Sequence, residues 1–204
     1  MRVFQVVGVR RSGKTTTAGI LIGSLKDRGY RVGAVKCIGC PLFTLDTDPA
    51  SGTSRLRNSG ADVVVAFGRK EVDFMYPGAP DMDRTLAILS SECLDYCVIE
   101  GGYGYDLPRI VCFRNMSEIG ERVTGNTFAL SGFGAGERLA AGEYPYPVIS
   151  ALKDPAALTD LIEASVNPLS LPVKKIPRPE SCRKFCGECS GHGKLSVTAK
   201  NLER

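Results

Sequence analysis

The chain has 204 residues, 43% of them hydrophobic, and a formal net charge of +4. This apolar share is enough for a folded core and excludes an intrinsically disordered chain. No stretch approaches the roughly 20 consecutive apolar residues of a membrane-spanning helix. The first residues read as a strand instead of a signal peptide, so we expect no membrane partner.

A phosphate-binding motif follows the first predicted strand. The mostly apolar residues 3–7 predict a strand over residues 2–7, and residues 8–15 then read Gly-Val-Arg-Arg-Ser-Gly-Lys-Thr. Apolar residues at helical spacing predict a helix over residues 14–28. This context is typical of a P-loop, whose backbone N–H groups surround a phosphate at the positive end of a helix dipole. We therefore expect a nucleoside triphosphate to contact the loop at Gly8, Arg11, Ser12, Gly13, Lys14, Thr15 and Thr16.

The rest of the chain alternates between strand and helix patterns. After the P-loop helix we predict a strand over residues 31–36, a loop to 52, a helix over 53–59, strands over 62–67 and 71–75, a helix over 81–93, strands over 96–99, 109–113, 127–130 and 147–150, and a helix over 155–165. This order predicts an α/β fold with a doubly wound, mostly parallel sheet. Ligands of such sheets bind at the carboxyl ends of the strands, so the P-loop, Lys36 and Glu100 are expected at one edge.

Two places in the sequence offer the carboxylate that a P-loop site needs. In such a site Lys14 would contact the β- and γ-phosphates and Thr15 would offer its hydroxyl to Mg²⁺. Glu100 ends the apolar run over residues 97–99, where an acid that binds Mg²⁺ or positions water belongs. Asp46 and Asp48 lie in the loop after the second strand, where they are either a second catalytic acid or part of a polar turn.

The identity of the base stays open from these residues. The chain contains no Asn-Lys-x-Asp motif for guanine. Asp154 follows the last predicted strand in the stretch Ser-Ala-Leu-Lys-Asp over residues 150–154. Its carboxylate could accept hydrogen bonds from guanine, and it could equally cap the last helix.

The order of these motifs resembles the MobB family, a GTP-binding adaptor of molybdopterin-guanine dinucleotide biosynthesis. The resemblance rests on the P-loop, on Lys36 at the end of the second strand, and on three segments that read Gly-Thr-Ser-Arg (52–55), Ser-Gly-Ala-Asp (59–62) and Val-Ile-Glu-Gly-Gly-Tyr (98–103). It covers residues 3–113 well and residues 127–164 in element order alone. The chain departs from the family's usual pattern at Arg10 and Arg11, at Thr53, and at the Lys-Cys-Ile-Gly-Cys stretch over residues 36–40.

The resemblance implies a P-loop NTPase fold, GTP with Mg²⁺ as ligands, and slow hydrolysis. By position it assigns the phosphate-binding lysine, the Mg²⁺-binding threonine and the strand-end acid to Lys14, Thr15 and Glu100. It implies a molybdenum cofactor biosynthesis protein as partner and leaves a homodimer open. We expect no nucleic acid as partner, and we expect a cytoplasmic location because the site needs intracellular nucleotide.

Two other classes of function share these motifs. An ATP-dependent synthetase of the dethiobiotin or cobyrinate type would use Lys36 to contact phosphate or substrate. A metal or iron–sulfur carrier would use the nucleotide as a switch that releases its cargo. Nucleotide preference separates the synthetase from the adaptor, and metal content identifies the carrier.

The end of the chain differs in composition from the rest. We expect a nucleotide-binding domain over residues 1–167 and a Pro-rich linker with a Cys-rich tail over residues 168–204. The tail spaces three cysteines as C-x3-C-x2-C and adds the single histidine of the chain: Cys182, Cys186, Cys189 and His192. Such ligands suit a Cys3His zinc site, or three irons of a [4Fe–4S] cluster. Cys37 and Cys40 could complete either site, whereas we expect Cys93 and Cys97 to be buried and inert.

We predict that the purified chain carries about one zinc ion or an oxygen-sensitive iron–sulfur cluster. Replacing Cys182, Cys186 and Cys189 with Ser should remove the metal, because deprotonated thiolates are its ligands. Metal and sulfide analysis after anaerobic purification checks this. His192→Ala should weaken a Cys3His zinc site and leave a three-cysteine cluster largely intact. Metal-free protein with three freely titrating thiols would contradict the prediction.

Overall fold

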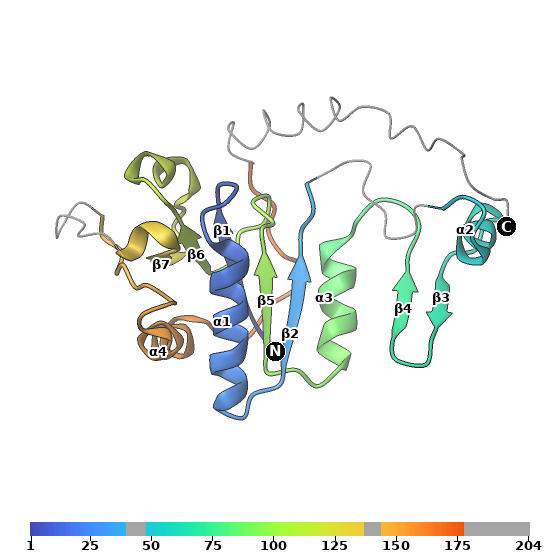
Figure 1. Cartoon of the computed structure of the whole chain (residues 1–204), viewed down its shortest axis with the longest axis horizontal. Coiled ribbons are helices and arrows are strands. Elements are labelled where there is room, and N and C mark those ends of the chain that lie inside the picture. Colours follow the sequence, from blue (N-terminus) through green and yellow to red (C-terminus); the bar gives the residue numbers. More distant parts are fainter. Residues whose placement is uncertain (40–47, 137–143, 178–204) are drawn as a thin grey trace, which may run out of the picture.

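The computed structural model describes residues 1–39, 48–136 and 144–177. Its main sheet has five parallel strands in the order β2-β5-β1-β6-β7. The strands are β1 (Arg2–Gly8), β2 (Val32–Lys36), β5 (Tyr96–Glu100), β6 (Arg109–Cys112) and β7 (Thr127–Ser131). The longer helices are α1 (Lys14–Asp27), α3 (Met82–Ser91) and α4 (Pro155–Ser165) (Figure 1). This arrangement confirms the predicted α/β fold with a mostly parallel sheet.

Strand β1 lies at the centre of the sheet and connects its two helical layers. Val3, Phe4, Val6 and Val7 are each at most 1% exposed, as expected for a parallel strand covered on both faces. Successive side chains alternate between the faces, so Phe4 and Val6 pack with α1 and α4, whereas Val3 packs with α3. Burial of each such side chain contributes ~1.5–3 kcal/mol, so β1 holds both layers in place.

Helix α1 continues directly from the P-loop and is fixed by its apolar side. Leu21 and Leu25 are fully buried and share a cluster with Leu158 and Ile162 of α4. The helix stops before Gly29, whose φ of 86° is a left-handed conformation that glycine adopts without steric cost. The predicted helix stop is confirmed, and the start of α1 is held at the edge of the sheet.

Two predicted strands lie outside the main sheet. β3 (Val64–Phe67) and β4 (Val72–Met75) form a separate antiparallel hairpin, and α2 (Gly52–Asn58) packs against β3. Within β3 only Val64 is buried, unlike the continuous burial along β1. A strand with one open face is typical of an antiparallel pair.

The strand expected over residues 147–150 is wrong in extent. Of that segment only Val148 pairs, as a single parallel bridge to Leu130 of β7. Pro147 has no N–H to donate to a ladder. The carbonyl of Ser150 accepts the Asp154 N–H at 2.8 Å, so the chain has already turned towards α4 and the pairing stops.

The cysteines of the main sheet are buried thiols. Burial raises the pKa of both Cys97 and Cys112 to about 12, so both stay protonated near neutral pH. The expectation that Cys93 is also buried is wrong. Cys93 lies two residues after α3 with a φ of 54°, and it is exposed.

The first part of the predicted linker runs back along the domain. Pro168 forms a bridge with Arg2, and the N–H of the buried Val173 donates to the Asp83 carboxylate at 2.7 Å. The domain boundary at residue 167 stays a prediction. Four expected metal ligands lie outside the described residues: Cys182, Cys186, Cys189 and His192.

In the described part of the chain, no helix combines the length and apolar character needed to cross a membrane.

Candidate nucleotide site

Both glycines of the P-loop motif hold backbone conformations that favour glycine. A Cβ on Gly8 would lie 2.2 Å from the carbonyl oxygen of Cys112. Gly13 has a φ of 93° and caps α1 in a left-handed conformation. Between them, the Ser12 hydroxyl donates to the Val9 carbonyl at 2.9 Å. The loop therefore has the tight backbone curve that the G-x-x-x-x-G pattern predicts.

Tyr103 and Gln5 tie the P-loop to the turn after β5, and sequence reasoning gave neither of them a role. The Gly8 N–H donates to the Tyr103 hydroxyl at 2.6 Å, and that hydroxyl donates to the Gly8 carbonyl. The Gln5 amide donates to the carbonyls of Gly102 at 2.6 Å and Gly101 at 3.3 Å. A glutamine inside an otherwise apolar buried strand was the available signal, because a buried amide needs partners.

Lys14 lies folded over the loop. Its ammonium group donates to the Val9 carbonyl at 2.6 Å. Burial lowers the pKa of Lys14, and the nearby Glu100 carboxylate opposes this shift. A phosphate bound in the loop would give this partly desolvated cation a stronger partner than a neutral carbonyl.

Three polar side chains converge at the carboxyl edge of the sheet. The Thr15 hydroxyl donates to Glu100 Oε1 at 2.8 Å, and the Lys36 ammonium donates to Glu100 Oε2 at 2.9 Å. Lys36 and Glu100 are register partners of the adjacent strands β2 and β5, and Thr15 is in the first turn of α1. The expectation that the P-loop, Lys36 and Glu100 share one edge is confirmed.

The donor set at this edge fits a magnesium ion. Adjacent ligands of an octahedral Mg²⁺ at about 2.1 Å lie about 2.9 Å from each other. Thr15 Oγ1 and Glu100 Oε1 are 2.8 Å apart, so both can face one ion directly or through its water shell. Hydroxyl and carboxylate oxygens are the ligands that this hard cation prefers.

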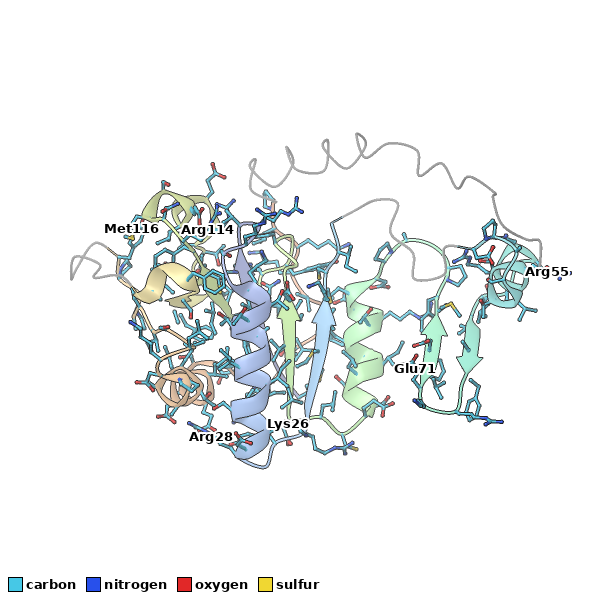
Figure 2. The ribbon with its side chains drawn as sticks, in the orientation of Figure 1. Lys26, Arg28, Arg55, Glu71, Arg114 and Met116 are labelled. Atoms are coloured by element: carbon cyan, nitrogen blue, oxygen red, sulfur yellow. The ribbon has the colours of Figure 1, made fainter. Side chains whose placement is uncertain are left out.

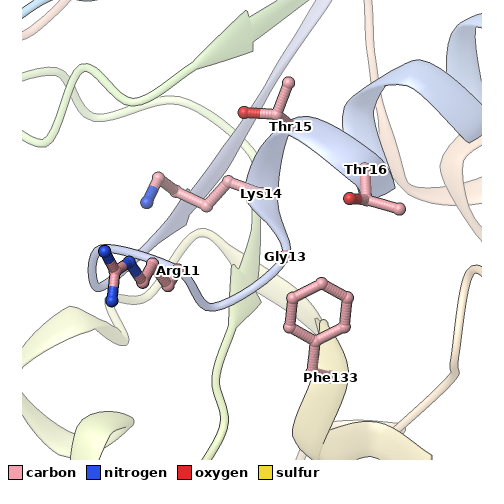
Figure 3. Close-up of a pocket in the computed structure, with 6 residues that line it drawn as sticks. All are labelled: Arg11, Gly13, Lys14, Thr15, Thr16 and Phe133. Carbon is pink, nitrogen blue, oxygen red and sulfur yellow. The ribbon is translucent and has the colours of Figure 1, made fainter.

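A pocket of about 240 Å³ opens beside the loop. It is lined by Arg11, Gly13, Lys14, Thr15, Thr16 and Phe133, which Figure 3 shows around the start of α1. Arg11 has a φ of 63°, an uncommon value for a non-glycine residue. Phe133 follows β7, and its N–H donates to the Ser12 carbonyl at 3.2 Å. Phe133 could not be assigned to the site from the sequence, because only the sheet order brings β7 towards the loop.

The family model described as "Molybdopterin guanine dinucleotide synthesis protein B" matches residues 3–131, which is more than half of the chain. The chain belongs to the MobB family. The expected membership is thereby confirmed, and with it a nucleotide-binding P-loop fold and a role in molybdenum cofactor biosynthesis.

Solved MobB structures share the fold of this chain. The crystal structure of Bacillus subtilis MobB has a TM-score of 0.66 at 23% identity, over 83% of this chain and 100% of that one. A MobB homologue from Bacillus stearothermophilus has a TM-score of 0.60 at 24% identity, over 80% and 97%. No curated protein sequence matches the chain significantly.

Asp154 and Asp48 of this MobB-family chain do not join the cluster around Glu100. Asp154 caps α4, with its carboxylate accepting the Ala157 N–H at 2.9 Å. Asp48 accepts the Ala50 N–H at 2.9 Å, as in the polar turn weighed for it. Asp46 lies outside the described residues. Among residues 1–39, 48–136 and 144–177, no three His, Cys, Asp or Glu side chains group as for a metal ion.

We predict that Glu100→Gln lowers the rate of any Mg²⁺-dependent nucleotide hydrolysis by roughly a hundredfold. The glutamine keeps the shape of the side chain but removes the charge that faces Thr15 and Lys36, while the loop backbone still binds phosphate. Nucleotide affinity should therefore change much less than the turnover rate, as measured by calorimetry and phosphate release.

Glu163→Gln is the matched control for this variant. Glu163 forms an ion pair with Arg28 at 3.1 Å on the α4 side of the domain, so its loss should leave hydrolysis unchanged. If hydrolysis also stays unchanged in Glu100→Gln, the acid is Asp46 or Asp48 instead.

Proposed function

We propose that this protein is a GTP-binding adaptor of molybdopterin-guanine dinucleotide biosynthesis. The observation that carries the proposal is the Thr15–Glu100–Lys36 cluster beside a closed P-loop. A Mg²⁺–nucleoside triphosphate requires a phosphate-binding backbone, a mobile ammonium group and an acid that faces a hydroxyl. The P-loop, Lys14 and the Glu100–Thr15 pair supply these parts. Family membership supports guanine as the base and a molybdenum cofactor protein as the partner.

The chain's own groups would exchange partners when GTP binds. Lys14 would leave the Val9 carbonyl for the β- and γ-phosphates. Thr15 and Glu100 would turn their oxygens to Mg²⁺, which neutralises phosphate charge when bound. Lys36 would hold Glu100 in place through the ion pair already formed, at 2.9 Å. The resulting complex of the protein with GTP and Mg²⁺ would hydrolyse GTP slowly. It would assist a partner enzyme in joining GMP to molybdopterin.

We predict that Lys14→Ala abolishes tight GTP binding and leaves the fold intact. The Lys14 side chain donates only to a loop carbonyl and lies in none of the apolar clusters, so its loss removes charge at the phosphates and little packing. Calorimetry with Mg²⁺ measures affinity, and thermal unfolding checks the fold. Retained micromolar affinity would contradict the P-loop assignment.

Competition between GTP and ATP tests the second part of the proposal. GTP should bind the wild-type chain more tightly than ATP does. ATP affinity equal to or above that of GTP would favour the synthetase of the dethiobiotin or cobyrinate type.

We propose that the chain forms a homodimer through the outer face of the hairpin. On its outer face the side chains are apolar and each at least 37% exposed: Val63, Val65, Phe67, Val72, Phe74 and Tyr76. They share a face because Val65 pairs with Phe74 and Phe67 with Val72 across the strands. The guanidinium carbon of Arg84 lies 4.5 Å from the centre of the Tyr76 ring at one end of this face. The six side chains themselves carry no charge, which suits contact with a second copy of the same face. Two such faces would bury on the order of 1,000 Å² in total, about the minimum for a specific interface.

We predict that Phe67→Asp, alone or with Phe74→Asp, shifts a dimer to monomer. Phe67 is 86% exposed, so the change costs the monomer little packing but places two carboxylates at the interface. Light scattering over a concentration series measures the mass. Ile88→Asp on α3, 39% exposed, is the control and should stay dimeric. A wild-type chain that is monomeric throughout the series would refute the interface.

A further inference from the structure

Phe133 is an aromatic side chain that the core does not use. It is 51% exposed and belongs to none of the three apolar clusters, although its neighbours Leu130 and Ala135 pack in one of them. Instead the ring lines the pocket beside the P-loop. Burial of a phenylalanine is strongly favourable in water, so an aromatic ring left half open at a ligand pocket indicates an apolar contact with the ligand.

The backbone on both sides holds this ring in position. A Cβ on Gly132, whose φ is 91°, would lie 2.4 Å from the Ser12 carbonyl oxygen. A Cβ on Gly134 would lie 2.6 Å from the ring of Phe113. The glycines on both sides of Phe133 thus pack tightly against Ser12 and Phe113. The Phe133 N–H itself donates to the Ser12 carbonyl. The ring is therefore carried by a backbone that is fixed to the P-loop, as a preformed contact surface should be.

The pocket has a charged end and an apolar end. The Lys14 ammonium lies on the side of Glu100 and Lys36, where the terminal phosphate and Mg²⁺ belong. Figure 3 shows the Phe133 ring on the other side of Gly13, facing Thr16 and away from the Lys14 ammonium. A Cβ on Gly13 would lie 3.4 Å from the Phe133 ring. A nucleotide with its terminal phosphate at Lys14 thus extends its nucleoside towards Phe133.

We propose that Phe133 is the platform on which the nucleobase of the bound nucleotide stacks. The inference rests on the proposed function, since it assigns the base end of the same site. Aromatic stacking accepts any base, because every base has a π-face. Phe133 therefore adds affinity for nucleotides over inorganic polyphosphates without choosing between guanine and adenine. The choice of base comes from hydrogen bonds elsewhere.

The experiment compares two ligands in the presence of Mg²⁺. One is a non-hydrolysable GTP analogue and the other is inorganic tripolyphosphate, which has the phosphates but no base. Calorimetry on Phe133→Ala should show roughly tenfold weaker binding of the GTP analogue and unchanged binding of tripolyphosphate. A non-hydrolysable ATP analogue, as a third ligand, should lose the same factor in affinity as the GTP analogue. Phe133→Tyr keeps an aromatic face and should bind the GTP analogue like the wild type.

Phe67→Ala is the matched control, because it removes a more exposed phenylalanine from the hairpin. It should leave both affinities unchanged. Unchanged affinity of Phe133→Ala for the GTP analogue would overturn the proposal. Equal losses for both ligands would also overturn it, since they would mean that the ring only supports the loop. Failure of the proposed function looks different, because the wild-type chain would then bind neither ligand, or Lys14→Ala would bind both normally.

Discussion

The site depends on the close contact between the P-loop and the carboxyl ends of its neighbouring strands. Gly8 approaches the Cys112 carbonyl so closely that no side chain fits, and both of its backbone polar groups are bonded to the Tyr103 hydroxyl. Gly132 approaches the Ser12 carbonyl in the same way. Residues from three different strand ends therefore fix one loop. Replacing any of these glycines would shift the backbone that forms the phosphate cradle.

The described side chains of the site carry more positive than negative charge. Glu100 is shared by the Thr15 hydroxyl and the Lys36 ammonium, and its side chain is only 15% exposed. Lys14 is partly desolvated and bonded to a neutral carbonyl. Arg11 adds a further cation to the pocket lining. An anion with several charges is the ligand that compensates this set, because local positive charge exceeds what Glu100 neutralises.

The sequence predicts those parts of the site that lie close together along the chain. Lys14 and Thr15 belong to one motif, and Glu100 ends an apolar run, so their positions follow from strand and helix patterns. Phe133 and Tyr103 could not be assigned in this way, because their contacts depend on which strands become neighbours. The apolar residues of β3 and β4 predicted two strands, but they did not show that these strands pair with each other in a separate hairpin. The strand expected over residues 147–150 is a single bridge at Val148, because an apolar run does not show that the chain turns towards α4 at Ser150.

The two interaction surfaces lie at opposite sides of the domain. The hairpin lies beyond α3 and the β2 edge, whereas Phe133 follows β7 at the other edge (Figure 1). In Figure 2, Glu71 beside the hairpin turn and Met116 on the β6–β7 side lie far apart along the long axis of the view. A dimer joined through the hairpin would therefore leave both nucleotide pockets uncovered. In the proposed adaptor this separation would keep the base end of the site open to a partner enzyme.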